Sequence, residues 1–144
     1  MDRAFVEQNQ AATERLKKLV AKLNEKDFGR KVGEHWTVAI ALAHIAFWEQ
    51  RVHLTLDKTE QAGKLVPVEP DIVVNDVMLP LMSIVPGPAA AKLAVEAAET
   101  LDKRLAALPE PVLEQLRAYN TRWVVRALHR NEHLDEVDAA LAKK

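Results

Sequence analysis

The sequence contains no cysteine and only four glycines among its 144 residues. Without cysteine, the protein cannot form disulfide bonds, thiolate metal sites or cysteine nucleophiles, so any metal site must use histidine, aspartate or glutamate. No stretch approaches the roughly 20 apolar residues that span a bilayer, and the first residues lack the apolar run of a signal peptide. These absences predict a cytoplasmic protein without a membrane segment.

Net charge is also nearly absent, since 20 lysine and arginine residues balance 21 aspartate and glutamate residues. No strong field of one sign is available to attract nucleic acid or an anionic membrane, and neither is an expected partner. Apolar residues make up 49% of the chain and charged residues 28%, which is typical of a globular protein. The length predicts a single domain over residues 1–144, large enough to bury a core.

The scarcity of glycine and the long stretches rich in alanine, leucine, glutamate and lysine favour helices throughout, so the fold class is predicted to be all-α. Asp2 and Thr37 are suited to cap the first two helices. Leu93 is expected on the buried stripe of the third. Four long helices are predicted, over residues 2–23, 37–56, 89–108 and 120–142.

Prolines separate these helices. Five of the seven prolines lie between residues 67 and 88, so the segment 57–88 is predicted to be a long crossover with one short helix over residues 71–79. A short turn is expected over residues 111–118. A crossover of this length allows one parallel pair of neighbouring helices inside a four-helix bundle, and a five-helix array is the alternative.

Two histidines of the last predicted helix, His129 and His133, lie four residues apart. This spacing places both rings on one face, where they can bind a single ion. The same spacing also occurs on solvated helix faces, so the pair alone is a weak indication of a metal site.

A third histidine, His44, lies on an apolar face of the second predicted helix. A lone buried histidine is more often a core residue satisfied by one hydrogen bond. Beside two further imidazoles, however, it can complete a nitrogen site with open coordination positions. We therefore predict that His44, His129 and His133 bind one divalent metal ion. His53 points to the opposite side of its helix and His35 precedes that helix, so neither is an expected ligand.

Three arginines are placed near these histidines by helical phase: Arg51, Arg122 and Arg126. Their guanidinium groups can bind the carboxylate or phosphate of a cofactor or substrate. No catalytic residue is assigned, because helical phase places no carboxylate squarely beside the histidines. The alternative is that the arginines cover apolar surface and pair with nearby carboxylates, namely those of Glu49, Glu132 and Glu136.

Two segments resemble signatures of a known family. The run HWTVAIALAHIAFWE, residues 35–49, resembles the Trp-Thr…His-Leu-x-x-Trp-Glu signature of the DinB-like superfamily, which includes the N-terminal domain of mycothiol-dependent maleylpyruvate isomerases. The run RALHRNEHLDEV, residues 126–137, is similar to that family's final helix, where a His-x3-His pair joins a histidine of the second helix. His44, His129 and His133 match the family's metal positions.

The resemblance implies an up-down-down-up four-helix bundle with the long crossover between helices 2 and 3, zinc or nickel as the metal, and a homodimer. For its characterised branches it implies transferase or isomerase chemistry that uses a low-molecular-weight thiol. The leading hypothesis is a small metal-dependent enzyme acting on a small-molecule substrate with such a thiol, or with metal-activated water as a hydrolase. The alternative is a non-catalytic, metal-stabilised dimeric bundle or ligand-binding module.

The histidine site also predicts a pH dependence. Imidazole must be neutral to bind metal, and its unperturbed pKa is about 6.5. Metal affinity is therefore expected to fall as the pH drops from about 7 to 5.

Overall fold

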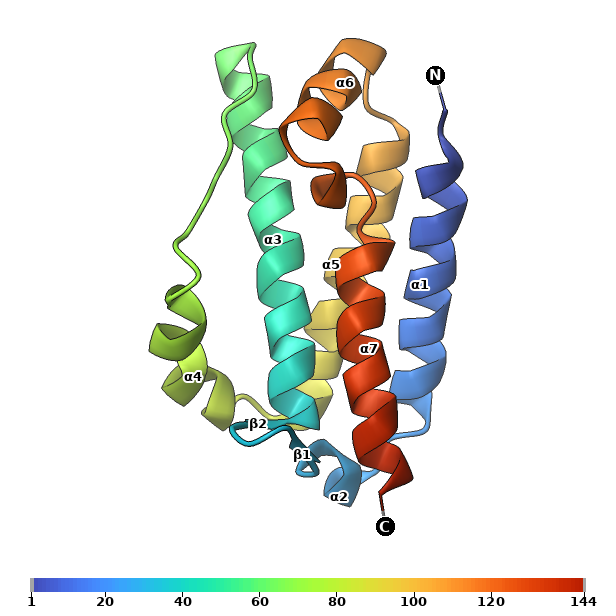
Figure 1. Cartoon of the computed structure of the whole chain (residues 1–144), viewed down its shortest axis with the longest axis vertical. Helices are drawn as coiled ribbons and strands as arrows, with labels where there is room; N and C mark the ends of the chain where they lie inside the picture. The colour runs from blue at the N-terminus through green and yellow to red at the C-terminus, as the bar shows by residue number, and fades with distance from the viewer. Residues whose placement is uncertain (1, 144) are drawn as a thin grey trace.

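The computed structural model describes residues 2–143, so only Met1 and Lys144 of the predicted domain lie outside the described residues. The predicted all-α class is confirmed. In Figure 1 the long helices lie side by side, with α3 and α5 running in one direction and α1 and α7 in the other. Among the helices described, none combines the length and apolar character needed to cross a membrane. The long helices are α1 (Ala4–Ala21), α3 (Val38–Ala62), α5 (Gly87–Ala106) and α7 (Ala127–Ala142).

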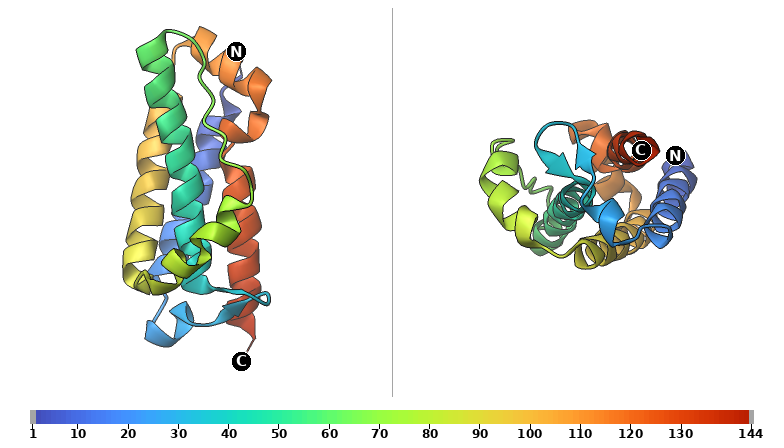
Figure 2. Two further views of the ribbon diagram at one scale, coloured as in Figure 1. Left: turned by 90° about the vertical axis from the view of Figure 1, so that its left-hand side faces the viewer. Right: turned by 90° about the horizontal axis from the view of Figure 1, so that it is seen from below.

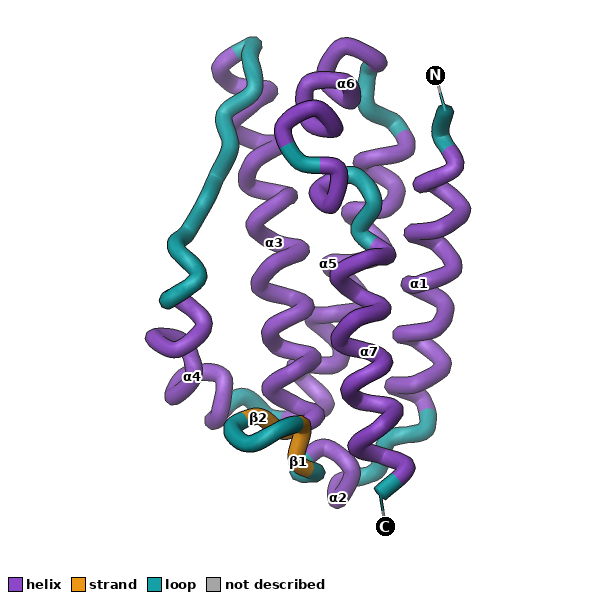
Figure 3. The backbone as a smooth tube through the Cα atoms, viewed as in Figure 1, coloured by secondary structure: helices purple, strands orange, loops and turns teal. Residues whose placement is uncertain are grey.

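Shorter elements occupy the connections. Figure 3 shows them at the ends of the long helices and along the crossover between α3 and α5. The antiparallel pairing Lys31↔Thr37 and Val32↔Trp36 was not predicted, because strands of two residues are too short for an alternating pattern. The elements are α2 (Glu25–Phe28), β1 (Lys31–Val32), β2 (Trp36–Thr37), α4 (Val74–Ile84), α6 (Glu110–Tyr119) and the 3₁₀ turn η1 (Thr121–Trp123).

The limits of α3 follow its capping residues. Thr37 caps the helix as predicted, since its Oγ1 accepts a hydrogen bond from the backbone N–H of Ile40 at 3.2 Å. The helix passes the expected end at residue 56 and stops at Gly63, whose φ of 71° is left-handed. Glycine adopts that conformation without steric cost, which makes Gly63 the helix terminator.

The crossover follows α3 and returns the chain to the end of the molecule where α5 begins (Figure 2, left). Its helix α4 covers residues 74–84 rather than the predicted 71–79, and Pro80 lies inside it. A proline removes one backbone donor and kinks a helix without always ending it. This return allows α3 and α5 to be parallel neighbours.

Two predictions about α5 and α6 are wrong in detail. α5 begins and ends earlier than the predicted 89–108, and Leu93 is 55% exposed because Ala90, Ala94 and Leu101 turn to the core instead. Residues 110–119 form the helix α6 rather than a short turn, and its Leu113 and Leu116 are buried. Leu93 instead borders an apolar groove beside α4.

The predicted start of the last helix at residue 120 is also wrong, because the chain forms η1 and an irregular turn before α7 begins at Ala127. The reason is a contact from another helix. The Asn9 side chain of α1 donates to the carbonyl of Val124 at 2.8 Å and accepts from the backbone N–H of Ala127 at 2.9 Å. These bonds satisfy backbone groups that a continuous helix would pair internally.

The core is divided along the helix axes. One apolar cluster includes Leu42 and Leu134, and a second includes Leu56 and Trp123. Buried polar residues lie near the boundary of the two clusters, within the four long helices or, for Arg126, just before α7. These residues are Asn9, Thr13, Glu49, Asp102, Arg126 and Arg130.

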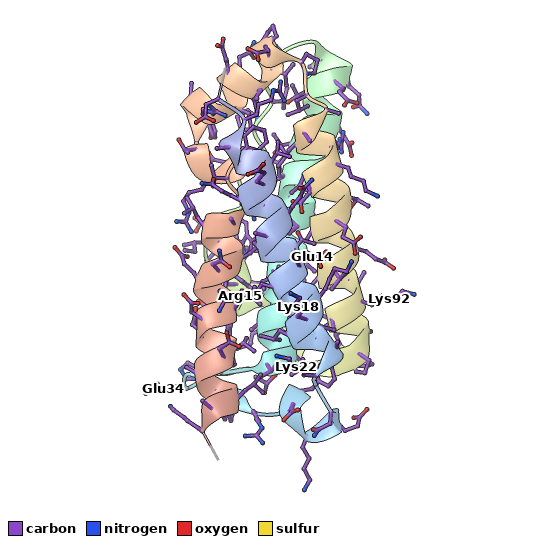
Figure 4. The ribbon with its side chains drawn as sticks, turned by 90° about the vertical axis from the view of Figure 1, so that its right-hand side faces the viewer. Glu14, Arg15, Lys18, Lys22, Glu34 and Lys92 are labelled. Carbon is purple, nitrogen blue, oxygen red and sulfur yellow. The ribbon has the colours of Figure 1, made fainter. Side chains whose placement is uncertain are left out.

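The outer face of α1 is charged and solvated. Figure 4 shows Arg15, Lys18 and Lys22 along this face. Arg15 reaches across to α7, where its Nη2 lies 2.7 Å from carboxylate oxygens of both Asp135 and Asp138. Exposed pairs of this kind contribute little stability.

Candidate metal site

Three histidines from two helices converge where α3 meets α7. The Nε2 atoms of His44 and His129 are 3.3 Å apart, and one ring nitrogen from each of His44, His129 and His133 lies within 4.8 Å of the others. Two imidazole nitrogens bound to one tetrahedral zinc lie roughly 3.3 Å apart, given Zn–N distances of about 2.0–2.1 Å. The structure therefore brings together the three predicted ligands in a group that can hold a metal ion.

The other two histidines lie away from this group, as predicted. The Nε2 atom of His53 faces α5, at 3.3 Å from the carbonyl oxygen of Ala97 and 3.2 Å from Thr100 Oγ1. The side chain of His35 is 78% exposed, and its nearest charged neighbour is Glu34 at 3.6 Å.

The surroundings hold the three clustered imidazoles in the neutral form. Burial lowers the pKa of His44 to about 3, and the neighbouring His133 adds to this effect. Burial, followed by the positive charge of Arg126, lowers the pKa of His129 to about 2. Burial also lowers the pKa of His133, against the opposing charge of Glu136. Neutral imidazole is the form that binds metal, so the site needs no deprotonation near pH 7.

Of the three rings, only His133 has a carboxylate from the described residues beside the nitrogen that would face away from a metal. The buried Nδ1 of His44 has no hydrogen-bond partner among residues 2–143. His133 Nδ1 lies 3.1 Å from a Glu136 carboxylate oxygen, although the atoms are not aligned as a hydrogen bond. A carboxylate beside the outer nitrogen of a histidine favours the tautomer whose inner nitrogen binds metal. Arg126 Nη2 lies 3.5 Å from His129 Nδ1, and because a guanidinium can only donate, this long contact weakly favours the tautomer of His129 with its proton on Nε2. Binding of a metal by Nε2 would therefore have to outweigh this contact.

The histidines open onto a cavity of about 440 Å³. One wall is the crossover, which is fixed to α3 by the hydrogen bond that Trp48 Nε1 donates to Asn75 Oδ1 at 3.0 Å. The ring of Trp36 packs on His44 with centroids 4.6 Å apart. Besides the three histidines, the cavity is lined by Trp36, Trp48, Trp123, Arg51, Arg122, Arg126, Glu69, Asn75, Asn120, Pro70 and Ile72.

All three predicted arginines line this cavity, but two of them are paired. Arg122 Nη2 lies 2.9 Å from Glu132, and Arg126 Nη2 lies 3.1 Å from Glu49. For these two residues the predicted alternative of pairing with nearby carboxylates is confirmed. Arg51 instead contacts the rings of Trp48 and Trp123.

Behind the cavity lies a buried ion network. Glu49 is fully buried and pairs with both Arg126 and Arg130, and Arg130 also pairs with Asp102 at 2.8 Å. Burial works against the charge of Glu49, but the two guanidinium groups outweigh it and hold its pKa below the usual range. Glu49 is therefore a partner of arginines rather than a base facing the cavity.

Sequence reasoning missed Asp102, Arg130, Asn9 and Thr13. Arg130 lies between the two histidines of the last helix, where a charged residue is usually interpreted as part of a solvated face. Asp102 contacts Arg130 and Thr13 only through the tertiary fold, at separations of 28 and 89 residues along the chain. One signal in the sequence points to this network. Glu49 follows the apolar face of the second predicted helix, and a carboxylate that is buried there requires basic partners.

Comparison with protein-family models, curated proteins and solved structures found no match to this chain. The resemblance to the DinB-like superfamily consequently depends on the two segments quoted above. The function must be inferred from the site itself.

Proposed function

We propose that His44, His129 and His133 bind one divalent metal ion, zinc or nickel, and that the protein is a small metal-dependent enzyme of the DinB-like kind. Its four long helices would then form an up-down-down-up bundle. The observation that carries the proposal is the convergence of three neutral imidazoles on the wall of a cavity, with two Nε2 atoms 3.3 Å apart.

Three protein nitrogens leave at least one coordination position for a molecule in the cavity. A bound divalent metal would lower the pKa of a coordinated water or thiol, which suits hydrolase or thiol-dependent transferase and isomerase chemistry. Trp36 packs on two of the ligand rings, with centroids 4.6 Å from His44 and 5.8 Å from His133. It thereby limits the access of water to the ligands from that side.

The buried network supports the proposal by fixing the helix that carries two of the ligands. Arg130 lies between His129 and His133 in the sequence and is held by Glu49 of α3 and Asp102 of α5. A ligand set is effective when the elements that carry it are rigid. These ion pairs keep α7 in register with α3, which carries His44.

The metal proposal is tested by calorimetric titration of the metal-free protein with zinc and with nickel. We expect one ion per chain, and His44→Ala, His129→Ala and His133→Ala should each weaken binding by more than about 100-fold, because each removes a protein ligand. The matched control is His53→Ala, from the same helix as His44, which should leave the affinity unchanged. Full affinity in all three ligand variants would exclude the site.

Catalysis is tested separately, with the metal-loaded protein. We expect metal-dependent turnover of a thiol-transfer or hydrolysis substrate, and its loss in His129→Ala. A metal that raises the melting temperature without any turnover would instead identify a non-catalytic, metal-stabilised module.

A further inference from the structure

The cavity beside the histidines contains one arginine, Arg51, that forms no ion pair with a carboxylate in the described part of the chain. The Cζ atom of Arg51 lies 4.8 Å from the ring centroid of Trp48 and 4.1 Å from that of Trp123. Its Nε is buried and has no hydrogen-bond partner in the described part of the chain, and no ion pair involves this residue there. The other two cavity arginines differ, because each is paired with a glutamate.

Arg51 nevertheless remains a cation. Burial and then the charge of Arg126 lower its pKa to about 10, which is still well above neutral pH. The charges of Glu69, which also lines the cavity, and of Glu49 partly compensate this cation, but neither carboxylate forms an ion pair with it. A partly buried guanidinium without a direct carboxylate partner favours binding of an anionic ligand, and contact with two indole rings offsets only part of its desolvation cost. The N–H groups of a guanidinium lie in its plane, so contact with aromatic rings leaves them able to donate hydrogen bonds to a ligand.

The position of Arg51 relative to the histidines sets the shape of the ligand. Arg51 follows His44 by seven residues on α3, which corresponds to two helical turns or roughly 10 Å along the helix. Both residues line the same cavity of about 440 Å³. A single small molecule can therefore extend from the histidines to Arg51.

We propose that the cavity binds a small organic acid whose carboxylate pairs with Arg51 beside Trp48 and Trp123, while a donor atom at its other end reaches the metal held by the three histidines. The metal end of this inference depends on the function proposed above. A carboxylate is favoured over a phosphate because one unpaired guanidinium supplies a planar fork and a single charge, which match a planar monoanion.

The test uses cobalt-loaded protein and a series of ω-mercaptocarboxylates of increasing chain length, each compared with its ω-mercaptocarboxamide. The thiolate-to-cobalt absorption band reports the metal end of the ligand, and the difference between acid and amide reports the carboxylate end. At the best chain length, we expect the acid to bind about 10- to 100-fold more tightly than the amide, the range typical of a charge-assisted contact.

This advantage should disappear in Arg51→Gln and be reduced in Arg51→Lys, which keeps the charge but loses the fork. Arg117→Gln is the matched control, because Arg117 also stacks on an aromatic ring, that of Phe5, but does not line the cavity. Equal affinities of acid and amide, or an equal loss in the Arg117 variant, would overturn the inference.

A second measurement separates this inference from the metal proposal. In metal-free protein, a simple alkanoate should shift the side-chain Nε–H resonance of Arg51 in a ¹⁵N NMR spectrum and leave that of Arg117 in place. An unchanged Arg51 resonance overturns the inference even if metal binds. A shifted resonance supports the carboxylate end of the inference even if cobalt fails to bind, and in that case the metal proposal fails together with the metal end of the ligand.

Discussion

Glu49 accepts hydrogen bonds from two arginines at once, with Arg126 Nη2 at 3.1 Å from its Oε1 and Arg130 Nη2 at 3.0 Å from its Oε2. All three side chains are at most 2% exposed. Desolvating such charges is costly, and only their mutual pairing makes the arrangement tolerable. Removing one partner therefore leaves buried charge uncompensated, which costs more than the pair itself contributes.

Glu49→Gln tests how much an uncompensated buried charge costs, because it replaces one carboxylate oxygen by an amide group. The substitution keeps the shape of the side chain but leaves Arg126 without a counter-ion, and we expect the free energy of unfolding to fall by about 3–5 kcal/mol in urea denaturation. The control is Glu132→Gln, which breaks the partly exposed pair with Arg122 and should cost about 0–1 kcal/mol. Similar costs for the two variants would contradict the importance of the buried network.

The convergence of the three histidines could be predicted from the sequence and the buried ion network could not, for a physical reason. His129 and His133 are related by local helical geometry, which sequence spacing contains directly. His44 could be added because a polar residue on an apolar stripe requires a partner. Asp102 and Arg130 meet across two helices, and nothing local distinguishes them from solvated charges.

At the scale of elements, the start of α7 is set from outside the helix. Asn9 of α1 accepts from the first residue of α7, Ala127, and donates to Val124 just before it. Helix starts leave backbone N–H groups unpaired, and a side chain from a neighbouring element satisfies one of them here. His129 follows only two residues later, so the same contact helps to position a proposed ligand.

Asn9→Ala should therefore affect both stability and metal binding. The loss of two buried hydrogen bonds is expected to lower the free energy of unfolding by about 2–4 kcal/mol. Metal affinity should fall by about tenfold, as for other supporting contacts around metal ligands. Gln10→Ala, at the adjacent exposed position of α1, is the control and should change neither quantity. A loss of stability without any change in metal affinity would show that the hydrogen bonds of Asn9 do not help to position the histidines.

The element limits show the same division between local and distant causes. The cap at Thr37 is local and was predicted, whereas the irregular turn before Ala127 depends on Asn9, which lies 118 residues earlier. Leu93 was assigned to the core by spacing, but the alanines of α5 allow closer helix packing on another face. The spacing of apolar residues shows reliably that a helix is amphipathic. It is a weaker guide to which of two neighbouring apolar stripes is buried.

At the scale of the whole molecule, the layer of buried polar residues fixes the positions of the long helices along their axes. This polar layer consists of Asn9, Thr13, Glu49, Asp102, Arg126 and Arg130. Residues of this layer come from α1, α3, α5 and the start of α7, between two apolar clusters. An apolar contact tolerates small shifts along a helix, whereas the paired charges of Glu49, Arg130 and Asp102 do not. We infer that the layer fixes the relative heights of α3 and α7, on which the geometry of the histidine group depends.

The buried histidines also change the pH dependence that was expected from unperturbed imidazole. Burial lowers the pKa of His44 to about 3 and that of His129 to about 2, so these two residues do not take up protons in the folded protein between pH 7 and 5. Burial also lowers the pKa of His133, against the charges of Glu136 and Glu132. Metal affinity of the folded protein should therefore fall less over that range than it would for three unperturbed imidazoles. The lowered pKa values instead make the stability of the metal-free protein depend on pH.

Metal-free protein should lose stability as the pH falls from about 6.5 to 5. In the unfolded chain these histidines take up protons near their ordinary pKa of about 6.5, whereas in the folded chain they stay neutral, so the unfolded state binds more protons and acid favours it. His44 alone contributes a slope of up to about 1.4 kcal/mol per pH unit. Urea denaturation at several pH values should show a shallower slope in His44→Gln, while His35→Gln, at an exposed position, should keep the slope of the natural protein. An unchanged slope in His44→Gln would mean that His44 takes up its proton equally in both states, which its burial beside two other imidazoles does not allow.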